Sequence, residues 1–106
     1  MKTLVLSEGT EFVYGENARE NSELTRSAAQ NHLWFHVAGS PSAHGVLKSE
    51  KVSKSELLEA AAIIKQRSKL KERRRVEVEC IQVKHVKIIN DHGTAQLTKQ
   101  TRKLYV

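Results

Sequence analysis

The segment from Lys65 to Arg75, KQRSKLKERRR, holds the residues best suited to binding a ligand in this sequence. It contains seven basic residues and one acidic residue. One or two cations would be enough to complement the dipole of a helix that ends here. Because like charges four residues apart on a helix repel, so dense a cluster favours a phosphate-rich partner over a merely solvated surface. The candidate binding residues are Lys65, Arg67, Lys69, Lys71, Arg73, Arg74 and Arg75.

A second group of candidates surrounds the single tryptophan, in the segment HLWFHVAGSPSAH. Strict alternation puts Trp34 and His36 on the strand face opposite to the apolar core face. Two interpretations are open: Trp34 is half-buried beneath a helix or loop with its indole nitrogen bonded, or it is reachable and stacks on nucleic-acid bases. Ser42 and His44 follow in a loop of small residues, whose backbone amides are suited to holding an anion. All four residues are therefore candidates for nucleic-acid binding.

Metal binding and catalysis find no supporting pattern. The single Cys80 excludes the Cys-x-x-Cys pairs that are typical of zinc sites. No G-x-S-x-G element surrounds Ser42, as acyl transfer in a hydrolase fold would require. Glu77 and Glu79 share the outer face of a predicted strand, where carboxylates are solvated. We therefore expect a protein that is not an enzyme and has no metal, cofactor or small-molecule substrate.

The distribution of charge indicates where a polyanion would bind. The net charge is +6, but residues 1–64 carry six basic against eight acidic residues, whereas residues 65–106 carry twelve against four. This asymmetry makes nucleic acid the usual partner and an anionic membrane surface the less usual one. Apolar runs are too short to cross a bilayer, and the amino end lacks the apolar length of a secretory signal. The expected location is the cytoplasm, with no membrane partner.

The elements that must position these residues are mostly short strands. The predicted strands span residues 4–6, 11–14, 32–37, 46–48, 76–83 and 84–89, with one or two more within 95–106. Residues 15–31 are polar and rich in asparagine, with Leu24 as their one sizeable apolar anchor, so we expect a loop with a helical turn. Cys80 lies within an apolar alternation and is expected to be a small buried hydrophobe.

The clearest helix begins after Ser53, which has capping-box spacing with Glu56: the hydroxyl serves a first-turn amide and the carboxylate reaches back. An apolar stripe follows at helical spacing, formed by Leu57, Leu58, Ala61 and Ile64. The polar face becomes more basic toward the carboxyl end. On a helix through residues 65–75, the cations would line two neighbouring edges, an arrangement suited to a phosphate backbone.

Local strand pairs, one helix and further strands do not alternate as a parallel α/β sheet requires. The pattern predicts an α+β fold: a mainly antiparallel β-sheet with one long amphipathic helix packed on it. With 106 residues and neither linker nor repeat, we expect a single domain over residues 1–106. Lys84 and Lys87 would extend the binding surface if their strands lie beside the end of the helix.

Several segments, in order over almost the whole chain, carry a resemblance to a known family. They are GENARENSELT (15–25), HLWFHV (32–37), SAH (42–44), EAA (59–61) with Ser68 and Lys69, and VKHVK (83–87). In this order and spacing the chain resembles the NFACT RNA-binding domain. It departs from the family pattern at Ala43 and at Gly45, where a β-branched residue is more usual. A glycine there should loosen the following strand slightly.

The resemblance implies RNA binding, with tRNA or ribosomal RNA as the ligand and the ribosome as a further partner. In that family the domain is usually the carboxyl-terminal part of a larger protein of ribosome-associated quality control, in which stalled nascent chains receive tails with the help of tRNA. Stand-alone versions also occur, and the resemblance does not extend to the tailing activity. By position, the family's signature covers Trp34, Phe35, His36, Ser42 and His44, and its basic stretch covers Lys69. The alternative function is a protein-interaction adaptor that docks an acidic or ribosomal partner through its basic face.

Overall fold

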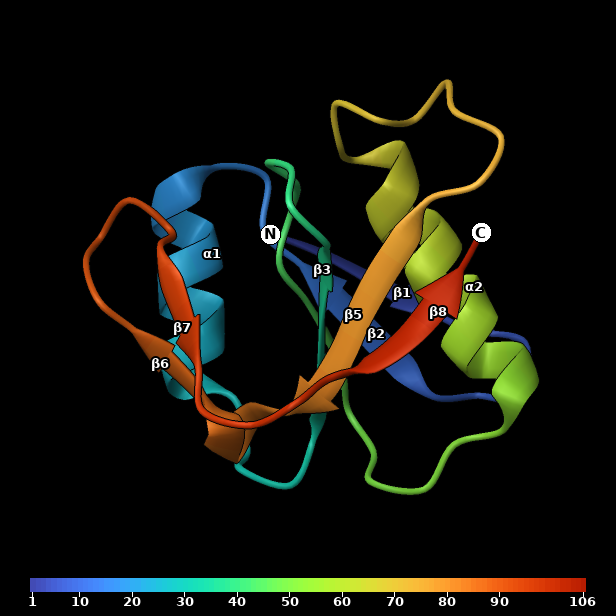
Figure 1. Cartoon of the computed structure of the whole chain (residues 1–106). Coiled ribbons are helices and arrows are strands. Elements are labelled where there is room, and N and C mark those ends of the chain that lie inside the picture. The colour runs from blue at the N-terminus through green and yellow to red at the C-terminus, as the bar shows by residue number, and fades with distance from the viewer.

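The computed structural model describes all 106 residues, and its main element is a six-stranded sheet in which every neighbouring pair is antiparallel (Figure 1). The strand order is β1-β2-β4-β3-β5-β8. These strands are β1 (Lys2–Val5), β2 (Glu11–Tyr14), β3 (Leu33–Val37), β4 (Gly45–Leu47), β5 (Glu77–Gln82) and β8 (Arg102–Tyr105). A short 3-10 helix, η1 (Val83–His85), leads into a separate hairpin of β6 (Val86–Ile88) and β7 (Ala95–Leu97). The predicted α+β class and mainly antiparallel sheet are thus confirmed.

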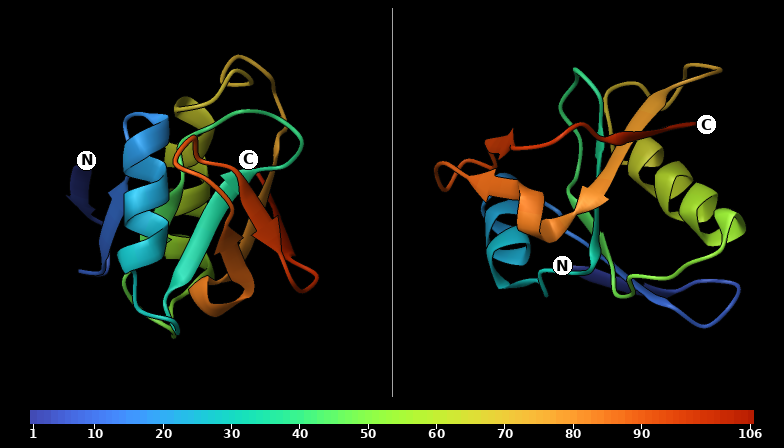
Figure 2. Two further views of the ribbon diagram at one scale, coloured as in Figure 1. Left: turned by 90° about the vertical axis from the view of Figure 1, so that its left-hand side faces the viewer. Right: turned by 60° about the horizontal axis from the view of Figure 1, so that its bottom comes forward.

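Two helices cover opposite faces of the large sheet. Helix α2 (Lys54–Gln66) lies on one face, and α1 (Ala18–Ser27) lies with the β6–β7 hairpin on the other (Figure 2). The prediction of one long amphipathic helix is not confirmed, because α1 has 10 residues and α2 has 13. The segment expected to be a loop forms α1, whose first turn is capped by Asn17, which accepts a hydrogen bond from the Glu20 amide at 2.9 Å. Neither helix is long and apolar enough to cross a membrane.

The hydrophobic core has two parts because the sheet is covered on both faces. Beneath α2, Phe12 and Phe35 meet edge to face, with ring centroids 5.7 Å apart. The second part lies beneath α1 and the hairpin and includes Leu24, Trp34 and Val46. The period-two alternation of β3 therefore sends Phe35 to one part of the core and its neighbour Trp34 to the other.

Helix α2 begins as predicted, but half of the predicted capping box is wrong. The Ser53 hydroxyl accepts a hydrogen bond from the Glu56 amide at 3.1 Å. The buried Glu56 carboxylate does not reach back; it accepts from the Thr10 hydroxyl at 2.6 Å and from the Glu8 amide at 3.1 Å. These hydrogen bonds, with that of the Thr10 hydroxyl foremost, hold the pKa of Glu56 below its usual value. They also fix the β1–β2 turn to the helix.

Gly45 lets α2 and the side chain of Phe12 approach the sheet closely. A Cβ at this position would lie 2.3 Å from Cζ of Phe12 and 2.8 Å from Cδ1 of Ile64, closer than packed atoms approach. The β-branched residue that is more usual in the family at this position would not fit here, because Phe12 and Ile64 occupy the space. Cys80, on the same face, is buried as predicted, and burial raises the pKa of its thiol to about 12.

Helix α2 ends at Gln66, so the basic segment does not continue the helix. The Arg67 amide donates to the Ile64 carbonyl at 3.0 Å, and residues 67–75 form turns that lead to β5. The apolar side chain that follows Ile64 is Leu70, which packs against the core from this loop. The prediction that the cations line two neighbouring edges of a helix is therefore wrong. The helix stops because it has no apolar face to bury beyond Ile64.

Candidate nucleic-acid interface

The loop of residues 67–75, called the cationic loop below, exposes six of the seven predicted cations. It lies at the top of Figure 1, beyond the end of α2. None of the seven forms an ion pair with a carboxylate of the chain. Arg75 lies 4.5 Å from the ring centroid of Tyr105, and the half-buried Lys65 donates from Nζ to the Val106 carbonyl at 3.2 Å. The remaining five side chains form an exposed positive surface, and no carboxylate of the chain forms an ion pair with them.

Beside the cationic loop lies a cleft of about 560 Å³, called the polar cleft below. Four segments form it at one end of the large sheet: the link from β2 into α1, the β3–β4 loop, the start of the cationic loop and the β6–β7 turn. Residues far apart in the sequence therefore meet around one hollow. Five predicted site residues line the polar cleft: His36, Ser42, His44, Arg67 and Lys69.

The β3–β4 loop holds the start of the cationic loop in place. Ser42 and Ser68 form an isolated antiparallel bridge, and the Ala43 amide donates to the Arg67 carbonyl at 3.1 Å. The Arg67 guanidinium carbon then lies 5.1 Å from the ring centroid of Tyr14. A cation that is already held in one place loses less conformational entropy when it binds a phosphate.

Two backbone amides of the β3–β4 loop are not free to hold an anion, although the sequence had suggested that they would be. The Ala43 amide is already engaged, and the His44 amide donates to Oδ1 of Asn21 at 3.1 Å. The Ser42 hydroxyl accepts from the Val37 amide at 3.1 Å and donates to the Ala43 carbonyl at 2.9 Å. These polar groups are therefore used to build the polar cleft.

Trp34 is 1% exposed, which contradicts its predicted role as a stacking surface for bases. The alternative interpretation is confirmed: Trp34 lies beneath α1 and its indole nitrogen donates to the Thr25 hydroxyl at 3.2 Å. Its ring stacks on His36 with centroids 5.6 Å apart and meets His44 edge to face at 5.1 Å. Trp34 therefore supports the two imidazoles that line the polar cleft.

Both imidazoles are neutral near pH 7. Burial lowers the pKa of His36, and burial followed by the charge of His36 lowers the pKa of His44 to about 4. The Thr25 hydroxyl donates to the Asn21 carbonyl at 2.8 Å, and its oxygen lies 3.2 Å from Nδ1 of His44. His44 is buried, and its ring meets the half-buried ring of His36 edge to face at 5.2 Å. His36 therefore presents the imidazole surface of this wall, and His44 supports it from within the fold.

The amino end of α1 forms another wall of the polar cleft. Gly15 comes so close to Asn21 that a Cβ on the glycine would lie 2.2 Å from Oδ1. The Gly15 amide donates to the His44 carbonyl at 3.1 Å, which ties this wall to β4. A helix amino end carries a partial positive charge. Glu16 also lines the cleft but carries a negative charge, and its carboxylate lies 3.4 Å from the amino group of Met1.

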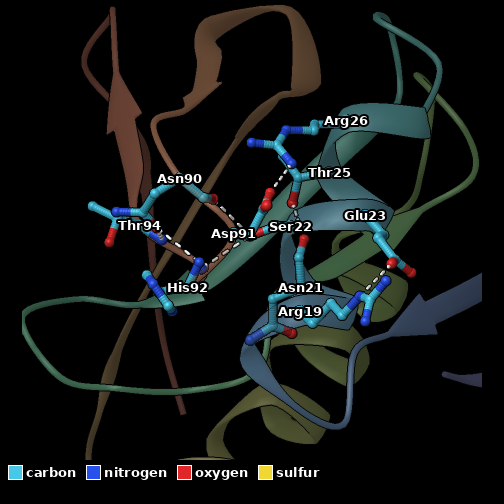
Figure 3. A network of polar contacts seen from close by, with 11 residues as sticks. Arg19, Asn21, Ser22, Glu23, Thr25, Arg26, Asn90, Asp91, His92 and Thr94 are labelled. Atoms are coloured by element: carbon cyan, nitrogen blue, oxygen red, sulfur yellow. Dashed lines mark hydrogen bonds and ion pairs between the residues drawn. The ribbon is translucent and has the colours of Figure 1, made fainter.

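The β6–β7 turn completes the polar cleft and carries the exposed His92 (Figure 3). The turn is docked on α1 through the buried Ser22, whose hydroxyl donates to the Asn90 carbonyl at 3.1 Å. Oδ1 of Asn90 accepts from the His92 amide at 2.8 Å, and an ion pair joins Arg26 to Asp91. These contacts fix the position of the His92 backbone beside the amino end of α1.

Lys84 and Lys87 do not join the cationic loop. Lys84 lies in η1 and Lys87 in β6, and both side chains are exposed. Figure 1 shows η1 at the bottom of the molecule, at the opposite end of the large sheet from the cationic loop. The predicted extension of the surface required these residues to lie beside the end of α2, and the fold places them elsewhere.

Three further residues line the polar cleft without having been predicted: Tyr14, Asn21 and His92. Tyr14 follows a strand pattern that signals core, and nothing in the sequence links it to Arg67. Asn21 lies within the 15–25 segment that carries the family resemblance, so that segment could have indicated it. No sequence pattern places His92 beside α1, because its docking depends on tertiary contacts.

Comparisons with known proteins agree with this architecture. A family model described as NFACT protein RNA binding domain matches residues 3–100. The Rqc2 homolog RqcH of Bacillus subtilis (strain 168) is 33% identical over 88 residues, which cover 82% of this chain and 15% of that protein. The solved C-terminal structure of the fibronectin/fibrinogen-binding protein from Streptococcus suis has a TM-score of 0.93 at 25% identity, over 99% of this chain and 44% of that chain. The chain thus spans less than half the length of these relatives.

Proposed function

The chain belongs to the family of NFACT protein RNA-binding domains, and on that premise we propose that it is a non-catalytic module that binds tRNA or ribosomal RNA. The cationic loop supplies most of the affinity by neutralising phosphates. The similarity to a protein named as an Rqc2 homolog supports a role in ribosome-associated quality control, with the ribosome as partner and the cytoplasm as location.

The observation that carries this proposal is that no carboxylate of the chain pairs with the cations of the cationic loop. Residues 67–75 contain six cations and one carboxylate, that of Glu72, and none of them is in an ion pair. Crowding like charges on the free domain is unfavourable, by a few tenths of a kcal/mol for each close pair. Phosphates along an RNA strand remove this repulsion and release bound counterions, which is a source of affinity.

The test compares two variants with the same change in net charge. The loop variant carries glutamate at Lys71, Arg73 and Arg74, which are exposed and have no side-chain partner in the fold. The matched control carries glutamate at Lys48, Lys51 and Lys54, which are exposed near the start of α2, at the bottom of Figure 1. Affinity for tRNA and for a ribosomal RNA fragment is measured by fluorescence anisotropy over a series of salt concentrations.

We expect the loop variant to lose most of its affinity and the control to lose little. Three lost phosphate contacts should make the slope of log affinity against log salt shallower by about 2 to 3, at about 0.7 per single-stranded and 0.9 per duplex phosphate. Equal losses in the two variants would mean that net charge alone drives binding, and would refute the role of the cationic loop. Sequencing RNA crosslinked to the chain in cells then decides between tRNA and ribosomal RNA.

A protein-docking role for the same loop is the second candidate. It is favoured by the similar solved structure, which comes from a fibronectin/fibrinogen-binding protein. A basic loop can bind an acidic protein surface through the same charges. The two functions separate on nuclease treatment: partners captured through RNA are lost, whereas a partner bound directly to the cationic loop is retained and is released by the loop variant.

A further inference from the structure

We infer that the polar cleft binds one nucleotide of the RNA, with the phosphate held by Arg67 and Lys69 and the sugar and base facing His36 and His92. This inference rests on the proposed function and deepens it, because it names the part of the RNA that enters the fold. The cationic loop then binds the neighbouring phosphates from outside.

The size of the polar cleft suits a single nucleotide. Its volume of about 560 Å³ lies within the range of roughly 300–1,000 Å³ that is usual for small-molecule sites. A nucleic-acid helix is too wide to enter a hollow of this size. A nucleotide at an RNA end, or one turned out of a single-stranded stretch, has the required dimensions, and single-stranded positions are where proteins contact unstacked RNA bases.

The two cations of the polar cleft are placed by the fold. Arg67 is held over Tyr14, and the intervening Ser68 is bridged to Ser42, so Arg67 and Lys69 flank a fixed point of the backbone. A planar guanidinium binds two phosphate oxygens at once, and an ammonium adds a point charge. The amino end of α1 faces the same hollow and favours an anion there. Together these groups define a phosphate position at the side of the cleft nearest the cationic loop.

The imidazoles match the remainder of a nucleotide. The partly exposed ring of His36 has nitrogen atoms that can hydrogen-bond to ribose hydroxyls or to base edges. The exposed ring of His92, on the far wall, offers a face on which a base can stack. Glu16 acts against an anion in the polar cleft, so Glu16→Gln is expected to strengthen nucleotide binding.

The experiment is a titration of the ¹⁵N-labelled chain with adenosine 5′-monophosphate, followed by the amide signals of the cleft glycines Gly15 and Gly93. We expect saturable shifts at both, and much weaker ones with adenosine alone or with inorganic phosphate alone. Lys69→Gln should weaken binding about tenfold, the usual effect of losing one charge-assisted hydrogen bond. The matched control Lys71→Gln, on the same loop but outside the polar cleft, should change it less than about twofold.

A further comparison identifies the source of the nucleotide. Preference for a short RNA with a 5′-phosphate over the same RNA with a 5′-hydroxyl assigns the cleft to an RNA end, and equal affinity assigns it to an internal nucleotide. If the monophosphate shifts no cleft signal, or if Lys69→Gln and Lys71→Gln behave alike, the inference is overturned while salt-dependent RNA binding by the cationic loop still stands. If neither tRNA nor the ribosomal RNA fragment binds, the proposed function itself has failed.

Discussion

Replacing Thr25 by valine tests whether one buried hydroxyl organises the wall of the polar cleft. Thr25 is 3% exposed, and its hydroxyl donates to the Asn21 carbonyl at 2.8 Å. The same oxygen accepts from the Trp34 indole at 3.2 Å and lies 3.2 Å from Nδ1 of His44. Valine keeps the shape of threonine but removes the oxygen. The indole N–H of Trp34 then loses its acceptor, and Nδ1 of His44 loses its hydrogen-bond partner.

The size of the effect follows from these two groups. Leaving a buried donor without a partner costs about 1–3 kcal/mol. Two such groups give an expected loss of about 2–6 kcal/mol in the free energy of unfolding, against a total of about 5–15 kcal/mol that is typical of a natural domain. Thr25→Ser is the matched control, because it keeps the hydroxyl and loses one methyl group, at a cost of about 1 kcal/mol.

Urea unfolding followed by the fluorescence of Trp34, the one tryptophan, measures both variants. Imidazole ¹⁵N spectra of both variants report on the hydrogen bond of His44, and we expect the Nδ1 signal to move in Thr25→Val and to stay in place in Thr25→Ser. If Thr25→Val is as stable as Thr25→Ser to within about 0.5 kcal/mol, the hydroxyl does not organise the wall. An unchanged Nδ1 signal in Thr25→Val would refute the hydrogen bond between Thr25 and His44 even if the stability result agreed.

Three further outcomes are expected. Gly45→Ala should lower the free energy of unfolding by about 1–3 kcal/mol, because its Cβ would lie 2.3 Å from Cζ of Phe12; thermal unfolding measures this, and an unchanged midpoint would contradict it. The folded-state pKa of His44 is about 4 against an ordinary 6.5, so the unfolded chain binds more protons between these values. Stability should be complete above pH 6.5 and fall toward pH 4, by up to about 3 kcal/mol; urea unfolding at several pH values would show no such slope if His44 were accessible. Glu56→Gln should lower the free energy of unfolding at pH 7. Because the pKa of Glu56 is lowered in the fold, the difference in stability from the unaltered chain should shrink as pH falls below about 4.5. A difference that urea unfolding finds independent of pH would show that the β1–β2 turn does not depend on the charge of Glu56.

The sheet could be predicted from the sequence because its signal is local. Alternation along residues 32–37 and 76–83 is a property of neighbouring residues, and it located β3 and β5 to within a residue or two. The same alternation assigned Phe35 and Trp34 to opposite faces, and this was confirmed. It could not show that both faces are covered, since that depends on what packs above them.

Helix α1 was missed because its stabilisation is not local. Its one large apolar residue, Leu24, gives too weak a periodic signal to indicate a buried helix face. The helix is held by polar contacts with distant segments: Ser22 with the β6–β7 turn, Asn21 with β4, and Thr25 with β3. These three residues lie on the face of α1 that is turned toward the sheet and hairpin. A polar core face of this kind cannot be distinguished from a solvated loop in the sequence alone.

The basic segment was predicted correctly in composition and wrongly in conformation. A signal for the end of α2 was present, because no apolar residue continues the stripe at Arg67, Ser68 or Lys71. The pairing of Ser42 with Ser68 has no sequence signal, and it is this bridge that brings Arg67 and Lys69 to the polar cleft while the remaining cations stay outside. The candidate site was thus predictable in its residue types and unpredictable in its geometry.

Mapping the residues that crosslink to RNA tests the central claim most directly. The chain is irradiated in complex with tRNA and with ribosomal RNA, the RNA is digested, and the peptides that retain a nucleotide are identified by mass spectrometry. We expect crosslinks within residues 67–75 and at His36 or His92 around the polar cleft. Crosslinks confined to η1 and residues 48–54, at the other end of the sheet, would contradict it.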